Sequence, residues 1–148
     1  LIAVVQRVNS CVVKIKNKDN SSIGKGILVL LGIEDGDGVN DIKYCVKKLI
    51  NLRIFNDNNG KMNLSTMDID AEIMVVSQFT LCGNTKKGNR PSYVSAMDVK
   101  LAKKLYNKFL DYMNQCYSKV KSGTFQADMN INLENDGPVT LIVRSKNG

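Results

Sequence analysis

The chain has 148 residues, of which 43% are hydrophobic, and its 21 Lys and Arg against 14 Asp and Glu give a formal net charge of +7. This length suits one domain over residues 1–148 whose core needs neither a disulfide nor a structural metal, and no apolar run approaches the roughly 20 residues that cross a bilayer. The absence of histidine excludes a Ser-His-Asp triad, a Cys-His dyad and a histidine-ligated metal centre.

The first part of the chain has the composition of β-strands. Residues 3–8 and 11–16 are short β-rich runs, separated by a turn-like pair at 9–10. The polar residues 17–22 are expected to turn the chain into a second hairpin. Residues 26–33 follow as a nearly continuous apolar run, which is typical of a buried central strand.

A helix is predicted next, over residues 40–51. Six apolar residues recur there at helical spacing: Val39, Ile42, Cys45, Val46, Leu49 and Ile50. A strand-like segment at 52–55 and a turn rich in Asn, Asp and Gly at 56–60 follow. The next strong strand is predicted over residues 72–81, and it leads into a basic loop at 83–91.

A second helix is predicted to begin near Ser95, with Asp98 as an acidic partner in its first turn. Its apolar stripe, interpreted as core, consists of Leu101, Leu105, Phe109, Tyr112, Met113 and Cys116. The remaining segments are predicted as strands at 123–127, 129–133 and, after a turn at 135–138, 139–144. Many strands with two unevenly placed helices do not form alternating βαβ units. The predicted class is therefore α+β, a single domain with a curved antiparallel or mixed, barrel-like sheet packed against two main helices.

The cysteines, the N-terminal residues and the net charge bear on the cellular compartment of the protein and on its partner. The four cysteines lie more than thirty residues apart, show no zinc-ligand spacing and are interpreted as reduced thiols. The first nine residues are too polar after Val5 for a signal peptide, so we expect a cytoplasmic protein. A net positive charge suits a polyanionic partner such as RNA, and it suits simple solubility equally well.

Two polar segments that adjoin apolar strands carry a resemblance to a known family. They are Ser77-Gln78-Phe79-Thr80 and Asn135-Asp136-Gly137-Pro138-Val139-Thr140. Both resemble the signature motifs SQxT and NxGPxT of the D-aminoacyl-tRNA deacylase family. Further segments similar to that family follow in the same order along the chain: 4–8, 26–32, 60–63, 87–92 and 125–129. One short match alone carries a high false-positive risk, whereas two with matched spacing are specific.

The resemblance implies that the chain hydrolyses the ester bond of D-aminoacyl-tRNA, D-Tyr-tRNA among others, without a metal or a cofactor. It places the ester carbonyl at the motif Ser77-Gln78-Phe79-Thr80, where unpaired backbone N–H groups near Phe79 and Thr80 would polarise it. A polar strand end is the alternative interpretation of this motif. The Thr80 hydroxyl is expected to assist by hydrogen bonding. Because no histidine is present to activate it, the tRNA 2′-hydroxyl is favoured over Thr80 as the activating group, and covalent attack by Thr80 stays open.

The resemblance also implies a homodimer in which Gly137-Pro138, joined by a cis peptide bond, reaches into the pocket of the partner subunit. From these residue types alone, a simple turn is the alternative. Two carbonyl oxygens of this loop, within the Asn135 motif, would bind the substrate's α-ammonium group and leave no space for an L side chain. Such a filter would not reject glycyl-tRNA, including Gly-tRNA(Ala). Arg7 is expected to brace the loop, and Met129 is expected near the terminal adenosine with Phe79. A surface cation and a core side chain are the alternatives for Arg7 and Met129.

The basic loop supplies three candidate tRNA contacts, Lys86, Lys87 and Arg90. A clamp on the acceptor stem and a merely solvated loop are equally compatible with this cluster. The expected partners are the acceptor 3′ end of D-aminoacyl-tRNA and a second copy of the chain, with neither a membrane nor DNA among them. A non-catalytic RNA-binding module and a structural dimerisation domain remain as alternatives. Only an enzyme would discharge D-aminoacyl-tRNA.

Overall fold

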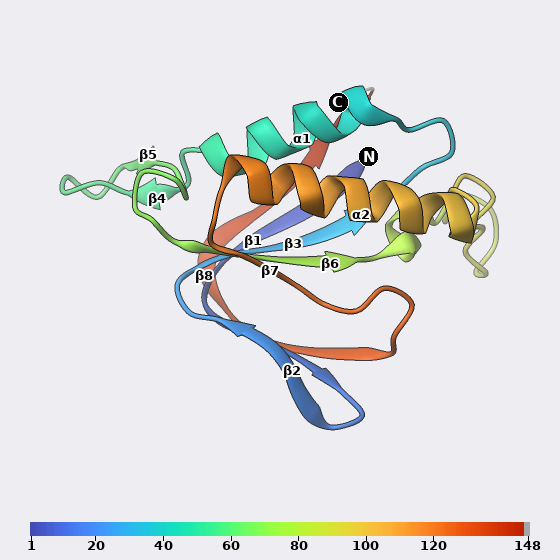
Figure 1. Cartoon of the computed structure of the whole chain (residues 1–148), viewed down its shortest axis with the longest axis horizontal. Coiled ribbons are helices and arrows are strands. Elements are labelled where there is room, and N and C mark those ends of the chain that lie inside the picture. Colours follow the sequence, from blue (N-terminus) through green and yellow to red (C-terminus); the bar gives the residue numbers. More distant parts are fainter. Residues whose placement is uncertain (147–148) are drawn as a thin grey trace.

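The sheet is built around β1 (Ile2–Ile15), which pairs with three other strands (Figure 1). The computed structural model describes residues 1–146. Within it, β2 (Lys18–Ile23) and β3 (Gly26–Gly32) run antiparallel to successive halves of β1, and β8 (Met129–Arg144) runs antiparallel along its other edge. β3 continues the sheet because β6 (Glu72–Ser77) lies parallel to it, and β7 (Val120–Ser122) lies parallel to β6.

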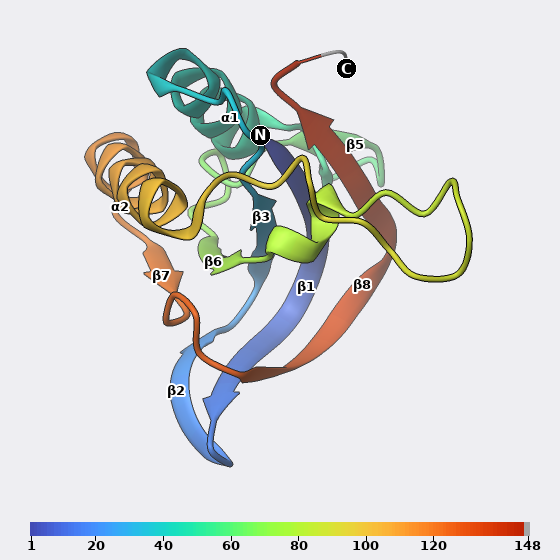
Figure 2. The same cartoon turned by 90° about the vertical axis from the view of Figure 1, so that its right-hand side faces the viewer.

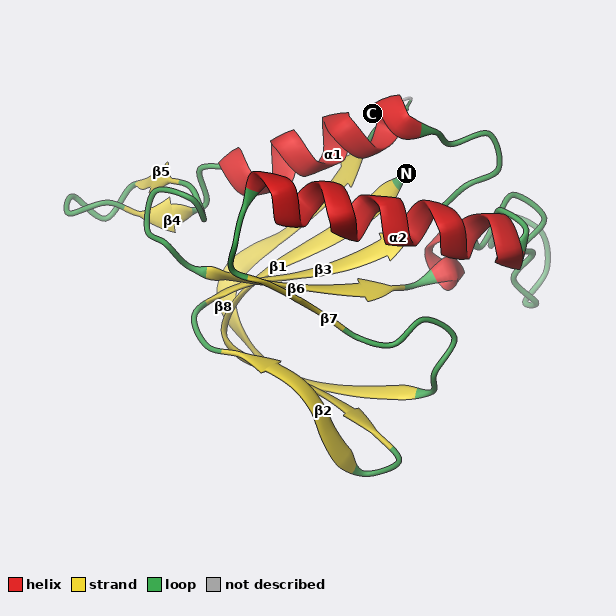
Figure 3. Cartoon of the chain, in the orientation of Figure 1, coloured by secondary structure: helices red, strands yellow, loops and turns green. Residues whose placement is uncertain are grey.

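Two helices cover one face of this sheet and lie side by side, as Figures 1 and 3 show: α1 (Val39–Asn51) and α2 (Val99–Cys116). The apolar side chains of β1, β3 and β6 meet the helices in one core, which includes Val5, Val29, Val75, Ile42, Leu49, Phe109 and Met113. The predicted α+β class is confirmed, with a mixed sheet nearly closed into a barrel and two main helices. No helix within residues 1–146 has the length and apolar composition to cross a bilayer.

The start of α2 differs from its prediction. The helix begins at Val99 rather than near Ser95, because the Asp98 carboxylate accepts hydrogen bonds from the N–H groups of Lys100 and Leu101 at 3.1 and 3.3 Å and so caps the first turn. Leu101 was predicted to lie in the core, but its side chain is 54% exposed. Tyr106, which the predicted stripe omitted, is buried in its place. The prediction for α1 is confirmed to within one residue.

Two segments that were predicted as turns between strands do not interrupt a strand in the structure. Residues 9–10 lie inside β1, and residues 135–138 lie inside β8. The register between the two strands shifts between Gln6 and Val8 and again between Val8 and Ser10. The two strands stay paired on either side of both polar segments, because bulges accommodate the extra residues. Turn-forming residue types here mark a distortion of the ladder and not its end.

Other boundaries moved by a few residues. The turn predicted at 17–22 is confined to Lys16 and Asn17, which have φ angles of 50° and 62°, and β2 then includes the polar residues. The strand predicted at 52–55 is reduced to β4 (Phe55–Asn56), which pairs with β5 (Met62–Leu64). The strand predicted at 123–127 is absent from the described structure, where that segment is a loop after β7.

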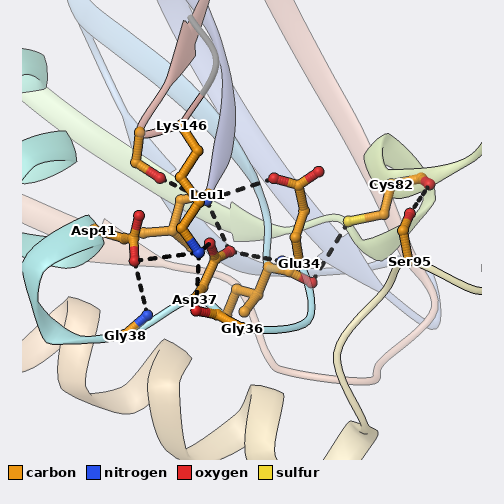
Figure 4. A network of polar contacts seen from close by, with 11 residues as sticks. Leu1, Glu34, Gly36, Asp37, Gly38, Asp41, Cys82, Ser95 and Lys146 are labelled. Carbon is orange, nitrogen blue, oxygen red and sulfur yellow. Dashed lines mark hydrogen bonds and ion pairs between the residues drawn. The ribbon is translucent and has the colours of Figure 1, made fainter.

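An ion network joins the two ends of the described chain to the segment before α1 (Figure 4). The Leu1 α-amino group lies 2.7 Å from a carboxylate oxygen of Asp37 and donates to the Ser145 hydroxyl at 2.8 Å. The Lys146 ammonium lies 3.1 Å from the other Asp37 oxygen. Asp37 is buried, so these opposite charges keep its carboxylate paired. The network thereby holds the start of β1 and the end of β8 together.

Candidate active site

The motif Ser77-Gln78-Phe79-Thr80 lies where β6 ends. The buried residues Val75 and Val76 hold β6 in the sheet, and the Gln78 N–H donates to the Leu31 carbonyl of β3 at 2.7 Å. The strand predicted to continue to residue 81 stops at Ser77, because the next residues form the 3-10 helix η1 (Phe79–Cys82). The apolar residues 79–82 mimicked a strand in the sequence, and the helical turn brings the motif to the sheet's edge.

The start of η1 presents two free backbone donors. Within residues 1–146, neither the Phe79 N–H nor the Thr80 N–H is hydrogen-bonded to a backbone or side-chain acceptor. The first N–H groups of a helix lack partners inside the helix and are aligned with its positive end. The Gln78 side-chain amide donates to the Thr80 hydroxyl oxygen at 2.6 Å. Such a donor holds the hydroxyl in place but cannot remove its proton.

Aromatic packing holds Phe79 in position. Its ring, which is 59% exposed, meets the Tyr93 ring edge-on with centroids 5.3 Å apart. This contact depends on Gly83, because a Cβ there would lie 2.9 Å from the Tyr93 ring and 2.9 Å from the Thr80 carbonyl oxygen. The close approach therefore fixes Tyr93 against the end of η1.

A cavity of about 690 Å³ opens beside this motif. Its walls come from the end of β6, the first turn of α2 and the segment 125–131, and they include Ser77, Gln78, Phe79 and Met129. The structure thus brings four predicted site residues together. Thr80 is adjacent to them but is not part of the wall. Sequence reasoning missed several wall residues as site residues, namely Tyr93, Met97, Asp98, Ala102 and the segment 125–128. The family-like segment 125–129 was the signal that could have identified part of this set.

The second motif has Arg7 at its centre. The Arg7 side chain is 5% exposed, and its Nε lies 2.9 Å from the Asp136 carboxylate. Its two other nitrogens donate to the Ile54 carbonyl at 2.6 Å and the Gly137 carbonyl at 3.2 Å. The Asn135 amide donates to the carbonyls of Arg7 and Val139 at 2.9 and 3.1 Å. A planar guanidinium satisfies several acceptors at once, so the Arg7 side chain holds the backbone around Gly137 in place.

The peptide bond between Gly137 and Pro138 is cis, and both residues are exposed. Neither they nor Arg7 line the cavity, although Met129 and Ile131 at the start of β8 do. In the sheet, β1 and β3 lie between β8 and β6 (Figure 2). One chain therefore does not bring the two motifs together. A Cβ built at Gly137 meets no atom of the described residues within 4 Å. The tip of this loop is thus free to meet another surface.

The three candidate tRNA contacts lie on the loop between η1 and α2, which projects from the body of the molecule (Figure 2). A backbone bridge between Asn84 and Ser92 closes the loop. Lys86, Lys87 and Arg90 are exposed, and none has a carboxylate partner within residues 1–146. The structure places them outside the cavity, on the same connection that carries Tyr93.

Known proteins that are similar to this chain identify its family. The family model of D-Tyr-tRNA(Tyr) deacylase matches residues 4–144. The chain belongs to this deacylase family. A D-aminoacyl-tRNA deacylase of Thermodesulfovibrio yellowstonii is 49% identical over 146 residues, covering 99% of this chain and all of the relative. One of Thermosipho melanesiensis is 52% identical over 145 residues, covering 97% of each chain.

Two solved structures are similar to the deacylase fold seen here. The c-Myc DNA Unwinding Element Binding Protein superposes with a TM-score of 0.94 at 41% identity, covering 97% of this chain and 98% of the other. A probable eukaryotic D-amino acid tRNA deacylase superposes with a TM-score of 0.83 at 18% identity, covering 96% and 97%. At that lower identity the second comparison supports the fold alone. Each superposition covers nearly the whole deacylase chain.

Proposed function

We propose that this deacylase hydrolyses the ester bond between a D-amino acid and the 3′-terminal adenosine of tRNA. The observation that carries the proposal is the pair of unpaired N–H groups of Phe79, which lines the cavity, and of Thr80 beside it. An ester carbonyl bound there would develop its negative charge against two fixed donors at a helix start. The donors need no reorganisation because the hydrogen bond of Gln78 to the Leu31 carbonyl fixes the preceding residue.

The nucleophile is a water molecule, assisted by the 2′-hydroxyl of the terminal adenosine. The Thr80 hydroxyl is disfavoured in that role because its partner is the Gln78 amide, which donates a proton and cannot accept one. Thr80 instead contributes a hydrogen bond to the substrate. Phe79 and Met129, which both line the cavity, would contact the adenosine. The enzyme then acts by positioning and electrostatics, without a covalent intermediate, a metal or a cofactor.

Stereochemical selection comes from a second copy of the chain. The loop of Gly137 and Pro138 is exposed and does not line the cavity of its own chain. In a homodimer it would enter the cavity of the partner subunit, where its carbonyl oxygens would bind the α-ammonium group and occupy the space of an L side chain. Glycine has no side chain to exclude, so Gly-tRNA(Ala) would also be discharged. Arg7 acts as a positioning residue through the Gly137 carbonyl.

The charged loop gives the acceptor stem a second contact. Lys86, Lys87 and Arg90 follow the motif along the chain and have no carboxylate partner in residues 1–146, so their charges are available to phosphates. Since charged tRNA is made and used in the cytoplasm, we place the reaction there. A binding module without catalysis is the second candidate function. The basic charge of the chain, taken alone, suits this module as well as it suits the enzyme.

Discharge of D-Tyr-tRNA and L-Tyr-tRNA, side by side with and without a chelator, tests the proposal. We expect rapid, chelator-resistant hydrolysis of the D ester alone. Glycyl-tRNA in a parallel reaction should be hydrolysed as well. If tRNA is bound but neither ester is cleaved, the binding module is correct and the roles assigned to both motifs fall. Equal hydrolysis of both stereoisomers would keep the ester site and reject the filter.

A further inference from the structure

The positive charge of the chain is concentrated in two places. Helices α1 and α2 carry seven lysines against two aspartates, and the loop at residues 83–92 carries three cations and no carboxylate. All other residues together hold eleven cations against twelve carboxylates. The net charge of +7 therefore belongs entirely to the helical layer and to the loop. A general requirement for solubility would not produce this segregation.

The lysines of α2 form one exposed face. They are Lys100, Lys103, Lys104 and Lys108, spaced so that they lie on the side opposite to the buried Tyr106, Phe109 and Met113. None of the four has a carboxylate within 4 Å among residues 1–146. From the first to the last of them, α2 advances by about 12 Å, at roughly 1.5 Å per residue.

This lysine face begins at the cavity. Asp98, which caps α2, and Val99 and Ala102 in its first turn line the cavity wall, and Lys100 and Lys103 alternate with them along the sequence. Figure 3 shows α2 starting above η1 and running away from it across the sheet. The start of α2 therefore lies between the cavity and the rest of the lysine face.

We propose that the lysine face of α2 binds the phosphate backbone of the tRNA acceptor arm that follows the 3′ end. The inference rests on the proposed function, which puts that 3′ end in the cavity. Unpaired lysine ammonium groups at successive turns suit a row of phosphates and read no bases, so the contact is independent of the tRNA sequence. It adds to the contact assigned to the loop with Lys86, Lys87 and Arg90, which leaves the cavity in another direction.

An anionic membrane is the other polyanion that a basic helix could meet. Helices that bind membrane surfaces insert an apolar face next to their basic one. In α2 that apolar face is already covered, because Tyr106, Phe109 and Met113 are all buried in the core. The structure therefore favours a nucleic acid, and vesicle binding is an outcome that the experiment must exclude.

The test compares two triple variants of the full-length protein. In the first, Lys100→Gln, Lys104→Gln and Lys108→Gln remove three charges from the lysine face while keeping side chains of similar helix propensity. In the matched control, Lys16→Gln, Lys18→Gln and Lys61→Gln remove three exposed charges that lie outside the helices and the basic loop. Both variants have the same net charge. Binding of uncharged tRNA is measured from 0.1 to 1 M salt, together with discharge of D-Tyr-tRNA and of a short D-tyrosylated RNA that ends in the same 3′ nucleotides.

We expect the α2 variant to lower the slope of log affinity against log salt by about 2 to 3, since each phosphate contact contributes about 0.7 to 0.9. Its deficit in affinity relative to the wild type should shrink by about a hundredfold to a thousandfold between 0.1 and 1 M salt. The preference for full-length over short substrate should fall as well. The control should match the wild type. Equal effects of both variants, an equal loss on the short RNA, or a loss seen only in sedimentation with anionic vesicles would each overturn the proposal. Because uncharged tRNA is one of the ligands, the lysine face is tested even if the wild type discharges nothing.

Discussion

Replacing Arg7 with lysine separates bracing of the Gly137 loop from the general stability of the sheet. The substitution keeps the charge but leaves one nitrogen to replace three. A lysine ammonium can still approach Asp136, whereas the contacts to the Ile54 and Gly137 carbonyls, at 2.6 and 3.2 Å in the wild type, cannot both survive. The variant therefore perturbs the loop through a residue that does not touch the substrate.

The two lost contacts differ in their expected cost. The Ile54 carbonyl is reached inside the protein, so its hydrogen bond to a charged donor should contribute about 1.5–3 kcal/mol. Gly137 is exposed, and water can replace the lost donor there at little cost in stability. We therefore expect unfolding in urea to report a loss of about 2–3 kcal/mol. The ratio of D-Tyr-tRNA to L-Tyr-tRNA discharge should fall by about tenfold or more. A tenfold fall requires that the displaced carbonyl reduce the discrimination between the two esters by only about 1.4 kcal/mol.

Arg144→Lys is the matched control, since Arg144 is an exposed arginine on β8, the strand that carries Gly137. Stability must be compared at one protein concentration, because a dimer's unfolding depends on it. The control should change neither the stability nor the stereoselectivity. A destabilised Arg7 variant that keeps its D-to-L ratio within about twofold would show that Arg7 supports the fold only.

Three further outcomes follow from single contacts. Thr80→Val should reduce D-Tyr-tRNA discharge by about tenfold, because it removes a hydrogen bond, whereas a loss above about 10⁴-fold would identify Thr80 as the nucleophile. Gly26→Ala should lower the free energy of unfolding in urea by about 3 kcal/mol or more. The added Cβ would lie 1.8 Å from the Glu72 carbonyl oxygen of the neighbouring parallel strand. A cost below about 1 kcal/mol would contradict that packing. Burial raises the pKa of the Cys45 thiol from 9.0 to about 11, so the unfolded chain loses this proton first and stability should fall as pH rises from 9 to 11. Cys45→Ala should flatten this fall by up to about 1.4 kcal/mol per pH unit, and an unchanged slope would show that other groups cause it.

The sequence predicted most where residue type alone determines the outcome. Helical spacing located α1 to within a residue. The apolar run at 26–33 identified β3 because a central strand that is buried on both faces is apolar throughout. Strand ends were harder, since η1 has the apolar composition of a strand and is separated from β6 only by how the backbone turns at Gln78. The polar segments within β1 and β8 look like turns when each is taken alone. Their bulges become visible only when the two strands are paired.

The candidate site shows the same limit. Local motifs identified Ser77, Gln78 and Phe79, which share one turn of chain. The opposite wall could not be derived from spacing, because Asp98 and Ala102 reach the cavity through the packing of α2 on the sheet. Nor does any pattern in the sequence state that the Gly137 loop lies outside the cavity of its own chain. That separation is a property of the folded chain, and because of it the proposed function requires a second copy of the chain.

This requirement can be tested by mixing two blocked subunits. Ala102→Trp would fill the cavity of its own chain, whereas Gly137→Trp would leave its own chain undisturbed and obstruct a cavity that receives the loop. Each variant alone should be inactive on D-Tyr-tRNA. Co-expression should restore about a quarter of the wild-type rate, because half of the randomly assembled dimers pair an open cavity with an intact loop at one of two sites. If each site lay within one chain, no dimer would contain an intact site, and the mixture would stay as inactive as its components.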